Sequence, residues 1–137
     1  MEISCLKHGV YNLGFIAIRR SEKAERFVDW WRDRLEIACY DDVSEGIFTD
    51  QKWINLIPIF FEPYILRDYG YNVATWNLQC RVVSQKDGVL FSNDRPIRFL
   101  HYSGIDSGTY FWAANKWVTQ NKELVISLGQ QYKQALI

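Results

Sequence analysis

The chain has no long hydrophobic run and no excess of charge of either sign. No apolar stretch approaches the ~20 residues that span a bilayer, and no signal-peptide core follows Met1. The 16 Lys and Arg residues balance the 16 Asp and Glu residues, and they are scattered along the sequence. The sequence therefore predicts a cytoplasmic protein, at most peripheral to the inner membrane, with no electrostatic footprint for nucleic acid.

Cysteine is scarce and is not spaced for metal binding or for disulfide pairing. Cys5, Cys39 and Cys80 are odd in number and far apart, and no Cys-x-x-Cys spacing occurs. This pattern favours reduced, mostly buried thiols of a cytosolic protein. A catalytic thiol would need His8 or His101 beside it, because these are the two histidines of the chain. Nothing in the spacing supports that pairing.

The residues that are present form an α/β pattern in a chain large enough for a hydrophobic core. The 137 residues are 48% hydrophobic and 16% aromatic, which is typical of a globular protein. The nearly continuous apolar run Tyr11–Ile18 predicts a central strand that is buried on both faces. Ser21 is the expected start of a long helix ending near Cys39, and its apolar stripe predicts packing against a sheet. The stripe comprises Ala24, Phe27, Val28, Trp31, Leu35 and Ala38.

Shorter elements are predicted for the rest of the chain. They are a helix from Thr49 or Asp50 to Pro58, a strand Pro63–Asp68, a turn Tyr69–Asn72, a hairpin of Arg81–Gln85 and Val89–Ser92, and a strand Pro96–Tyr102. The Asp-Gly dipeptide between the two hairpin runs is typical of a tight hairpin turn. A last helix carries an apolar stripe that either packs on the fold or forms a docking face. That stripe comprises Leu124, Val125, Leu128, Tyr132, Ala135 and Leu136.

Four short motifs place polar, hydrogen-bonding residues at the ends of apolar stretches. They are Tyr11–Phe15 (YNLGF), Asp50–Lys52 (DQK), Ala74–Leu78 (ATWNL) and His101–Gly104 (HYSG). Their order and spacing resemble the C-terminal, acceptor-side half of GT-A-fold nucleotide-sugar glycosyltransferases of the glycogenin and bacterial galactosyltransferase-like group. The resemblance implies that residues 1–137 are a single domain, the C-terminal portion of a catalytic domain. It implies a partial GT-A-like (Rossmann-like) mixed sheet with packed helices, lacking the N-terminal nucleotide-binding half.

The resemblance also implies an activity and a set of site residues. The activity is transfer of a hexose from a nucleotide-sugar donor to a glycan or lipid-linked acceptor, in bacterial polysaccharide biosynthesis. In such enzymes Mn²⁺ (or Mg²⁺), held by an Asp-x-Asp pair and a C-terminal His, neutralises the departing diphosphate. His101 is the implied metal ligand, and Asp50 and Gln51 are the implied catalytic pair. The implied substrate-binding residues are Asn12, Gly14, Trp76, Asn77, Ser103 and Gly104.

Several of these residues also have a purely structural interpretation, and for Asn12 it is that of a strand-end residue. A lone His that follows an apolar strand is usually structural, although His101 would stand where α/β sheets place ligands. Asp50 and Gln51 carry planar groups that bind sugar hydroxyls, but Asp50 could equally start a helix. Trp76 offers an indole face to a pyranose, whereas the alternative is that the Trp-Asn pair holds its own loop.

The chain departs from the resembled pattern in what it lacks. No Asp-x-Asp and no Gly-rich phosphate loop occur, and Ile105–Thr109 contains no cation where the family often has Lys-Pro-Trp. The donor-binding half is therefore expected outside these residues, and the chain alone is expected to be nearly inactive. Apolar surface that this half would cover predicts homo-oligomerisation. The alternatives are a non-catalytic carbohydrate-binding module and an oligomerising scaffold.

Overall fold

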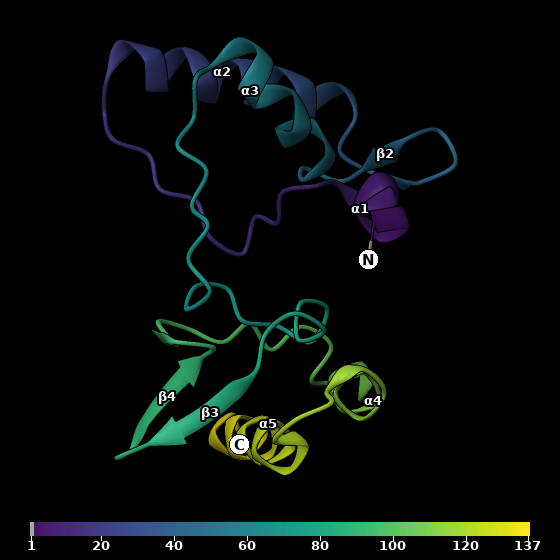
Figure 1. Ribbon diagram of the computed structural model, residues 1–137. Coiled ribbons are helices and arrows are strands. Elements are labelled where there is room, and N and C mark those ends of the chain that lie inside the picture. Colours follow the sequence, from purple (N-terminus) through teal and green to yellow (C-terminus); the bar gives the residue numbers. More distant parts are fainter. Residues whose placement is uncertain (1) are drawn as a thin grey trace. The chain divides into compact units, whose positions relative to one another are not determined.

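The computed structural model describes residues 2–137, which form two compact units with their boundary between Leu66 and Arg67 (Figure 1). Helices occur together with a two-stranded and a three-stranded antiparallel sheet. The broad α/β class predicted from the sequence is thus confirmed. That both units belong to one catalytic domain stays a prediction.

Helices dominate the first unit. Its elements are α1 (Glu2–His8), α2 (Glu22–Ile37), β1 (Asp41–Asp42), β2 (Ile47–Phe48), the 3₁₀-helix η1 (Lys52–Leu56) and α3 (Ile57–Phe60). The strands β1 and β2 pair antiparallel through Asp41 with Phe48 and Asp42 with Ile47. The helix α2 begins where the sequence predicts, because the Ser21 Oγ accepts a hydrogen bond from the Ala24 N–H at 3.2 Å. This bond satisfies one of the donors that a helix N-terminus leaves free.

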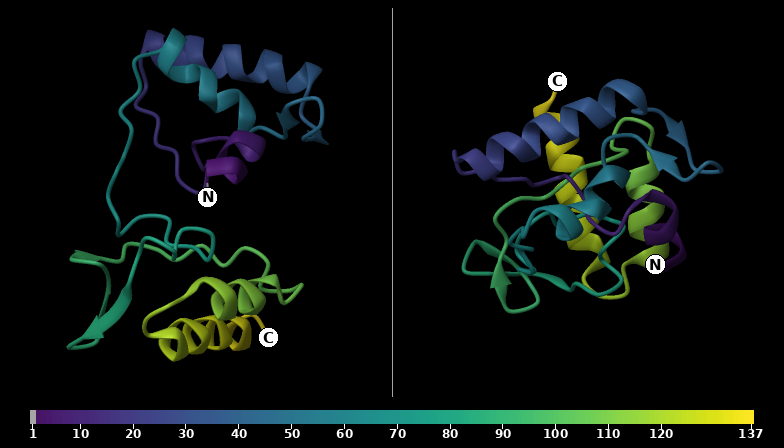
Figure 2. Two further views of the ribbon diagram at one scale, coloured as in Figure 1. Left: turned by 45° about the vertical axis from the view of Figure 1, so that its right-hand side comes forward. Right: turned by 90° about the horizontal axis from the view of Figure 1, so that it is seen from above.

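The apolar face of α2 packs on η1 and α3 instead of on a sheet (Figures 1 and 2). Phe27 is 8% exposed and shares a core cluster with Ile54 and Ile57. Its ring stacks on that of Trp31, with centroids 5.7 Å apart, and meets the Phe61 ring edge-on at 5.6 Å. The burial of Phe27 was predicted correctly, but the predicted partner was wrong.

The predicted central strand Tyr11–Ile18 is also wrong, because this segment has no regular secondary structure. Three of its apolar side chains are half exposed, with Phe15 and Ile16 at 44% and Ile18 at 47%. Backbone N–H and C=O groups of a buried strand need neighbouring strands as partners. Within the described part of this unit the only ladder is the short β1–β2 pair. An apolar run becomes a strand only where such neighbours exist.

Two further boundaries differ from the sequence prediction. Pro58 does not end a helix but lies in the first turn of α3, which continues to Phe60. Proline is tolerated there because the first N–H groups of a helix have no intrahelical acceptor, so none is lost. The segment Pro63–Asp68, predicted as a strand, has no regular secondary structure.

The second unit combines a small sheet with two helices. Its elements are β3 (Val83–Lys86), β4 (Val89–Ser92), β5 (Arg95–Pro96), α4 (Thr109–Trp117) and α5 (Lys122–Ala135). The predicted hairpin is confirmed, with Lys86 opposite Val89. Asp87 and Gly88 between them have φ of 50° and 77°, the left-handed pair that a type I′ hairpin turn requires. The predicted turn Tyr69–Asn72 is confirmed as well.

The segment Pro96–Tyr102 is extended, but it is not the apolar strand that was predicted. Only Pro96 belongs to a strand, and Leu100 forms an isolated parallel bridge with Val73. The start of this segment is bonded to β4, where Ile97 N donates to Leu90 O at 2.8 Å, and the rest of its backbone is bonded to residues 70–73. Arg98 N donates to Gly70 O at 2.8 Å, and His101 N donates to Val73 O at 2.8 Å. These bonds hold His101 against the turn.

The core of the second unit lies between the sheet and the two helices. It comprises Val73, Leu78, Val83, Ile105, Tyr110, Ala114, Val118 and Val125. The predicted C-terminal helix is confirmed as α5, and Val125 of its stripe is 2% exposed. The end of the stripe is uncovered, with Leu136 at 57% exposure. Within residues 2–137, no helix has both the length and the apolar character needed to cross a bilayer.

Gly129 allows α5 to approach the Tyr110 ring of α4. A Cβ atom at position 129 would lie 2.3 Å from Tyr110 Cε1. The ring cannot move away easily, because Tyr110 is 3% exposed and its hydroxyl donates to Val125 O at 2.9 Å.

We expect Gly129→Ala to lower the free energy of unfolding by about 1–3 kcal/mol, as overpacked cores do. Urea denaturation would measure this, with the exposed Gln130→Ala of the same helix as the control. Equal stability of the two variants would contradict the close packing.

Candidate functional site

The residues of the four motifs form one cluster in each unit. Asn12, Gly14, Asp50 and Gln51 lie in the first unit. Trp76, Asn77, His101, Ser103 and Gly104 lie in the second.

In the first unit, Gln51 ties the YNLGF motif to the end of α1. Its Oε1 accepts from Asn12 Nδ2 at 3.0 Å and from the Leu13 N–H at 3.4 Å, and its Nε2 donates to His8 O at 2.9 Å. Asn12 Oδ1 in turn accepts from the Gly14 N–H at 2.9 Å. The structure therefore brings together two motifs that are 39 positions apart in sequence. The same bonds give Gln51 a structural role, as the holder of this loop.

Asp50 and Lys52, on either side of Gln51, differ in what they contact. Asp50 Oδ1 accepts from Thr49 Oγ1 at 3.0 Å, and its backbone oxygen accepts from Trp31 Nε1 at 3.4 Å. The N-cap of η1 is Gln51, without a side-chain cap bond, so the interpretation of Asp50 as a capping residue is wrong. Lys52 Nζ donates to the carbonyl oxygens of Leu6 and Lys7 at the end of α1. A cation there complements the negative end of the helix dipole.

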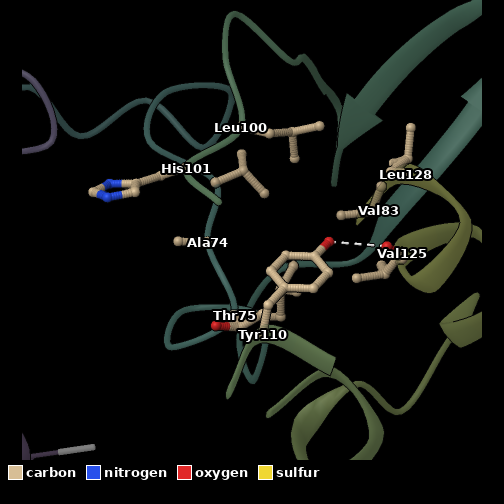
Figure 3. Close-up of a pocket in the computed structure, with 10 residues that line it drawn as sticks. Ala74, Thr75, Val83, Leu100, His101, Tyr110, Val125 and Leu128 are labelled. Atoms are coloured by element: carbon tan, nitrogen blue, oxygen red, sulfur yellow. Dashed lines mark hydrogen bonds between the residues drawn. The ribbon is translucent and has the colours of Figure 1, made fainter. Parts of the chain in front are cut away.

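In the second unit, His101 lies between a side-chain acceptor and an indole ring. Its Nδ1 is 2.9 Å from Asn72 Oδ1. The Trp76 ring meets the imidazole edge-on, with centroids 4.8 Å apart and an interplanar angle of 83°. In Figure 3 the imidazole of His101 points away from the apolar side chains around Tyr110. The structure thus brings the ATWNL and HYSG motifs into contact.

The environment of His101 favours a neutral imidazole. Partial burial lowers the pKa of His101, so the uncharged ring predominates at pH 7. Asn72 Oδ1 can only accept, so this contact favours the tautomer that carries the ring proton on Nδ1. A neutral imidazole with one nitrogen oriented by a second residue is the arrangement typical of metal-ligating histidines. Across residues 2–137 no group of three or more His, Cys, Asp and Glu side chains could hold a metal.

Trp76 and Asn77 differ in what they contact. Asn77 Oδ1 accepts from the Ala74 N–H at 3.1 Å, and its Nδ2 donates to Asn72 O at 2.8 Å. Asn77 thus holds its own loop, which is the structural interpretation of this residue. Trp76 is partly exposed, and its ring contacts His101.

The Ser103-Gly104 pair forms the turn that leads into α4. Gly104 has φ of 73°, and a Cβ there would lie 2.9 Å from Thr109 Cβ, so the position requires glycine. Its carbonyl accepts from the Tyr110 N–H at 3.0 Å. Ser103 is exposed. A glycine would let a ligand approach the backbone closely, but the positive φ and the contact with Thr109 already explain why a glycine stands here.

Two residues near His101 were not singled out from the sequence. Asn72 contacts the imidazole, and Arg81 Nη1 donates to the carbonyl oxygens of Tyr71 at 2.7 Å and Tyr69 at 3.3 Å. Burial lowers the pKa of Arg81 from its ordinary value, although a guanidinium remains charged. A signal for Asn72 was present, because Asn is favoured in left-handed turn positions and stands in the predicted Tyr69–Asn72 turn.

Two hollows differ in their relation to the motif residues, because the first is lined partly by Ala74, Thr75 and His101 and the second by none of them. A cavity of about 10 Å³, walled by Val73, Leu78, Val125 and other mostly apolar side chains, lies beside the His101 backbone (Figure 3). It holds at most one water molecule, and its apolar lining does not favour even that. An open groove of about 480 Å³ runs over Ile18, Ala24 and Val28 in the first unit. The thiols are less buried than predicted, because Cys39 and Cys80 are exposed and Cys5 is intermediate.

Comparison with known proteins gives two relatives. No protein-family model matches the chain, and no solved structure matches it. YfnF and YfnD of Bacillus subtilis, both described as uncharacterized proteins, are each 30% identical to it, over 98 and 99 residues respectively. The match covers 70% of this chain but 32% of each relative. The chain thus spans about a third of the length of the curated relatives it matches.

Proposed function

We propose that this chain is the acceptor-side part of a metal-dependent, GT-A-fold glycosyltransferase that transfers a hexose from a nucleotide-sugar. The observation that carries the proposal is the ordered set of four motifs, whose residues lie in contact in pairs. Asn12 is bonded to Gln51, and Trp76 meets His101.

In this proposal His101 is one ligand of Mn²⁺ or Mg²⁺. Its neutral ring and the hydrogen bond at Nδ1 suit that role. One imidazole among oxygen ligands favours Mn²⁺ over Mg²⁺. The carboxylate ligands belong to the other half of the enzyme, since no three-residue metal group occurs within residues 2–137. When bound, the ion neutralises charge on the departing diphosphate.

Asp50 is the residue proposed to bind the acceptor and the reacting sugar. Gln51 and Asn77 are mainly engaged with the protein, so they hold loops and contribute to the site through them. The Asp50 carboxylate accepts one hydrogen bond from Thr49 Oγ1 and retains acceptor capacity for sugar hydroxyls. Trp76 offers an apolar ring edge beside the proposed metal ligand.

A donor-and-metal assay tests the proposal. The 137-residue chain and the complete reading frame that contains it are incubated with UDP-glucose, UDP-galactose and UDP-N-acetylglucosamine, with Mn²⁺ or with EDTA. We expect nucleotide release that depends on the metal in the complete protein and little or none in the 137-residue chain. Glycan binding by the complete protein without any dependence on nucleotide or metal would refute the proposal and favour the carbohydrate-binding module.

A further inference from the structure

The hydrogen bond between His101 and Asn72 joins two residues 29 positions apart in sequence. It sets the tautomer of the ring, because a neutral imidazole carries one proton and an amide oxygen can only accept. With Asn72 Oδ1 at 2.9 Å from Nδ1, the proton lies on Nδ1 and the lone pair on Nε2. Trp76 limits rotation of the ring from another side, through its edge-on contact at 4.8 Å.

Asn72 itself is held in an uncommon backbone conformation. Its φ is 52°, in the left-handed region that side chains other than Asn and Asp rarely adopt. The Asn72 carbonyl accepts from Asn77 Nδ2 at 2.8 Å and from Arg81 Nη1 at 3.4 Å. Two side chains from outside the turn therefore fix the backbone from which the Asn72 amide reaches His101. Such over-determined left-handed residues cluster at functional sites.

We infer that Asn72 is a positioning residue, which holds His101 in the Nδ1–H tautomer and so makes Nε2 the nitrogen with which the ring would bind a metal ion. The inference rests on the proposed function for the identity of the ion, but the tautomer itself does not depend on it. A glycine would satisfy the left-handed turn more easily than asparagine. The amide therefore contributes something that the turn does not need, namely an acceptor for the imidazole. Asn77 and Arg81 act indirectly, because they bond to the backbone of Asn72 and not to His101.

Nuclear magnetic resonance of the metal-free 137-residue chain tests the inference directly. The ¹⁵N shifts and long-range couplings of a histidine ring distinguish its two neutral tautomers. Spectra are recorded well above the ordinary imidazole pKa of ~6.5, where the ring is neutral. The other histidine, His8, is identified by its loss in a His8→Gln variant. We expect the His101 proton on Nδ1.

Three variants separate positioning from general damage. Asn72→Gly keeps the left-handed backbone but removes the acceptor, so we expect the proton to move largely to Nε2. Asn72→Asp keeps an acceptor oxygen and is expected to retain the Nδ1–H tautomer. Asn93→Gly is the control, because Asn93 is also left-handed, with φ of 56°, and its side chain bonds to Val82 N and Cys80 O instead of to His101. It should leave the His101 signals unchanged.

A wild-type proton on Nε2, or an Asn72→Gly spectrum that keeps it on Nδ1, would overturn the inference. The wild-type spectrum by itself shows which nitrogen of His101 carries the proton, so the inference can be tested even if the glycine variant does not fold. In the complete protein, Asn72→Gly is expected to weaken Mn²⁺ binding about 10- to 100-fold, as loss of an orienting residue does, and Asn72→Asp should restore most of it. If the Nδ1–H tautomer is found but the complete protein shows no metal-dependent transfer, the proposed function fails and the inference about Asn72 stands. Transfer that needs His101 but tolerates Asn72→Gly would remove this inference alone.

Discussion

His101→Ala is expected to reduce Mn²⁺-dependent nucleotide release by the complete protein by about 100- to 1,000-fold while leaving it folded. Under the proposed function, the substitution would remove a ligand from the ion that would neutralise charge on the departing diphosphate. Its structural cost is expected to be small, because His101 is only half-buried and its backbone bond to Val73 O survives the change. Release of nucleotide diphosphate at saturating donor, with Mn²⁺ titrated, is the measurement.

His8→Ala is the matched control for this prediction. His8 lies in α1, where its Nδ1 is 3.0 Å from Ser4 O and its ring meets Phe48 edge-on. Because Gln51 is bonded to the His8 backbone oxygen, the loop contact survives the substitution. We expect activity close to that of the unaltered protein. If His101→Ala keeps its metal-dependent activity but melts at a lower temperature, His101 is structural and the site assignment fails.

Phe27→Ala is expected to lower the free energy of unfolding by about 3–5 kcal/mol. Phe27 is 8% exposed, and its ring contacts those of Trp31 and Phe61. Truncation would remove the central ring of this cluster and leave a cavity that rigid neighbours cannot fill. Urea denaturation followed by tryptophan fluorescence would report the loss, since Trp30 and Trp31 lie in the same cluster.

Val28→Ala provides the comparison on the same helix. Val28 is adjacent in sequence but 44% exposed, so its truncation removes little buried surface. We expect a loss below about 1 kcal/mol. A Phe27→Ala variant as stable as Val28→Ala would mean that α2 is not anchored by this cluster.

Parts of the candidate site could be anticipated and others could not. The sequence motifs singled out Asn12, Gln51, Trp76 and His101, but they did not predict that Asn12 would bond to Gln51 or that Trp76 would contact His101. The specific roles within each pair needed coordinates, because one amide can bind a sugar or hold a loop with the same atoms. Gln51 and Asn77 hold loops in the structure. The turn preference of Asn72 was visible in the sequence, but its contact with His101 spans 29 residues, and no local pattern records that contact.

Local chemistry by itself determined the elements whose signals lie within a few residues. Ser21 starts α2 through a bond to a backbone N–H three residues later, and Asp87 and Gly88 close their hairpin through their own φ preferences. The helical stripe of α5 likewise depends on spacing within one element. Such features do not need a partner elsewhere in the chain.

Tertiary structure alone decided the elements whose backbone needs distant partners. The segments Tyr11–Ile18 and Pro96–Tyr102 are apolar enough to be strands, yet the first has no ladder and the second pairs mainly with a turn. A strand exists only if another segment supplies its hydrogen bonds, and a run of apolar residues carries no information about that segment. The same reason applies to His101, whose position follows from bonds to Val73 and Asn72 that only the folded chain brings into reach.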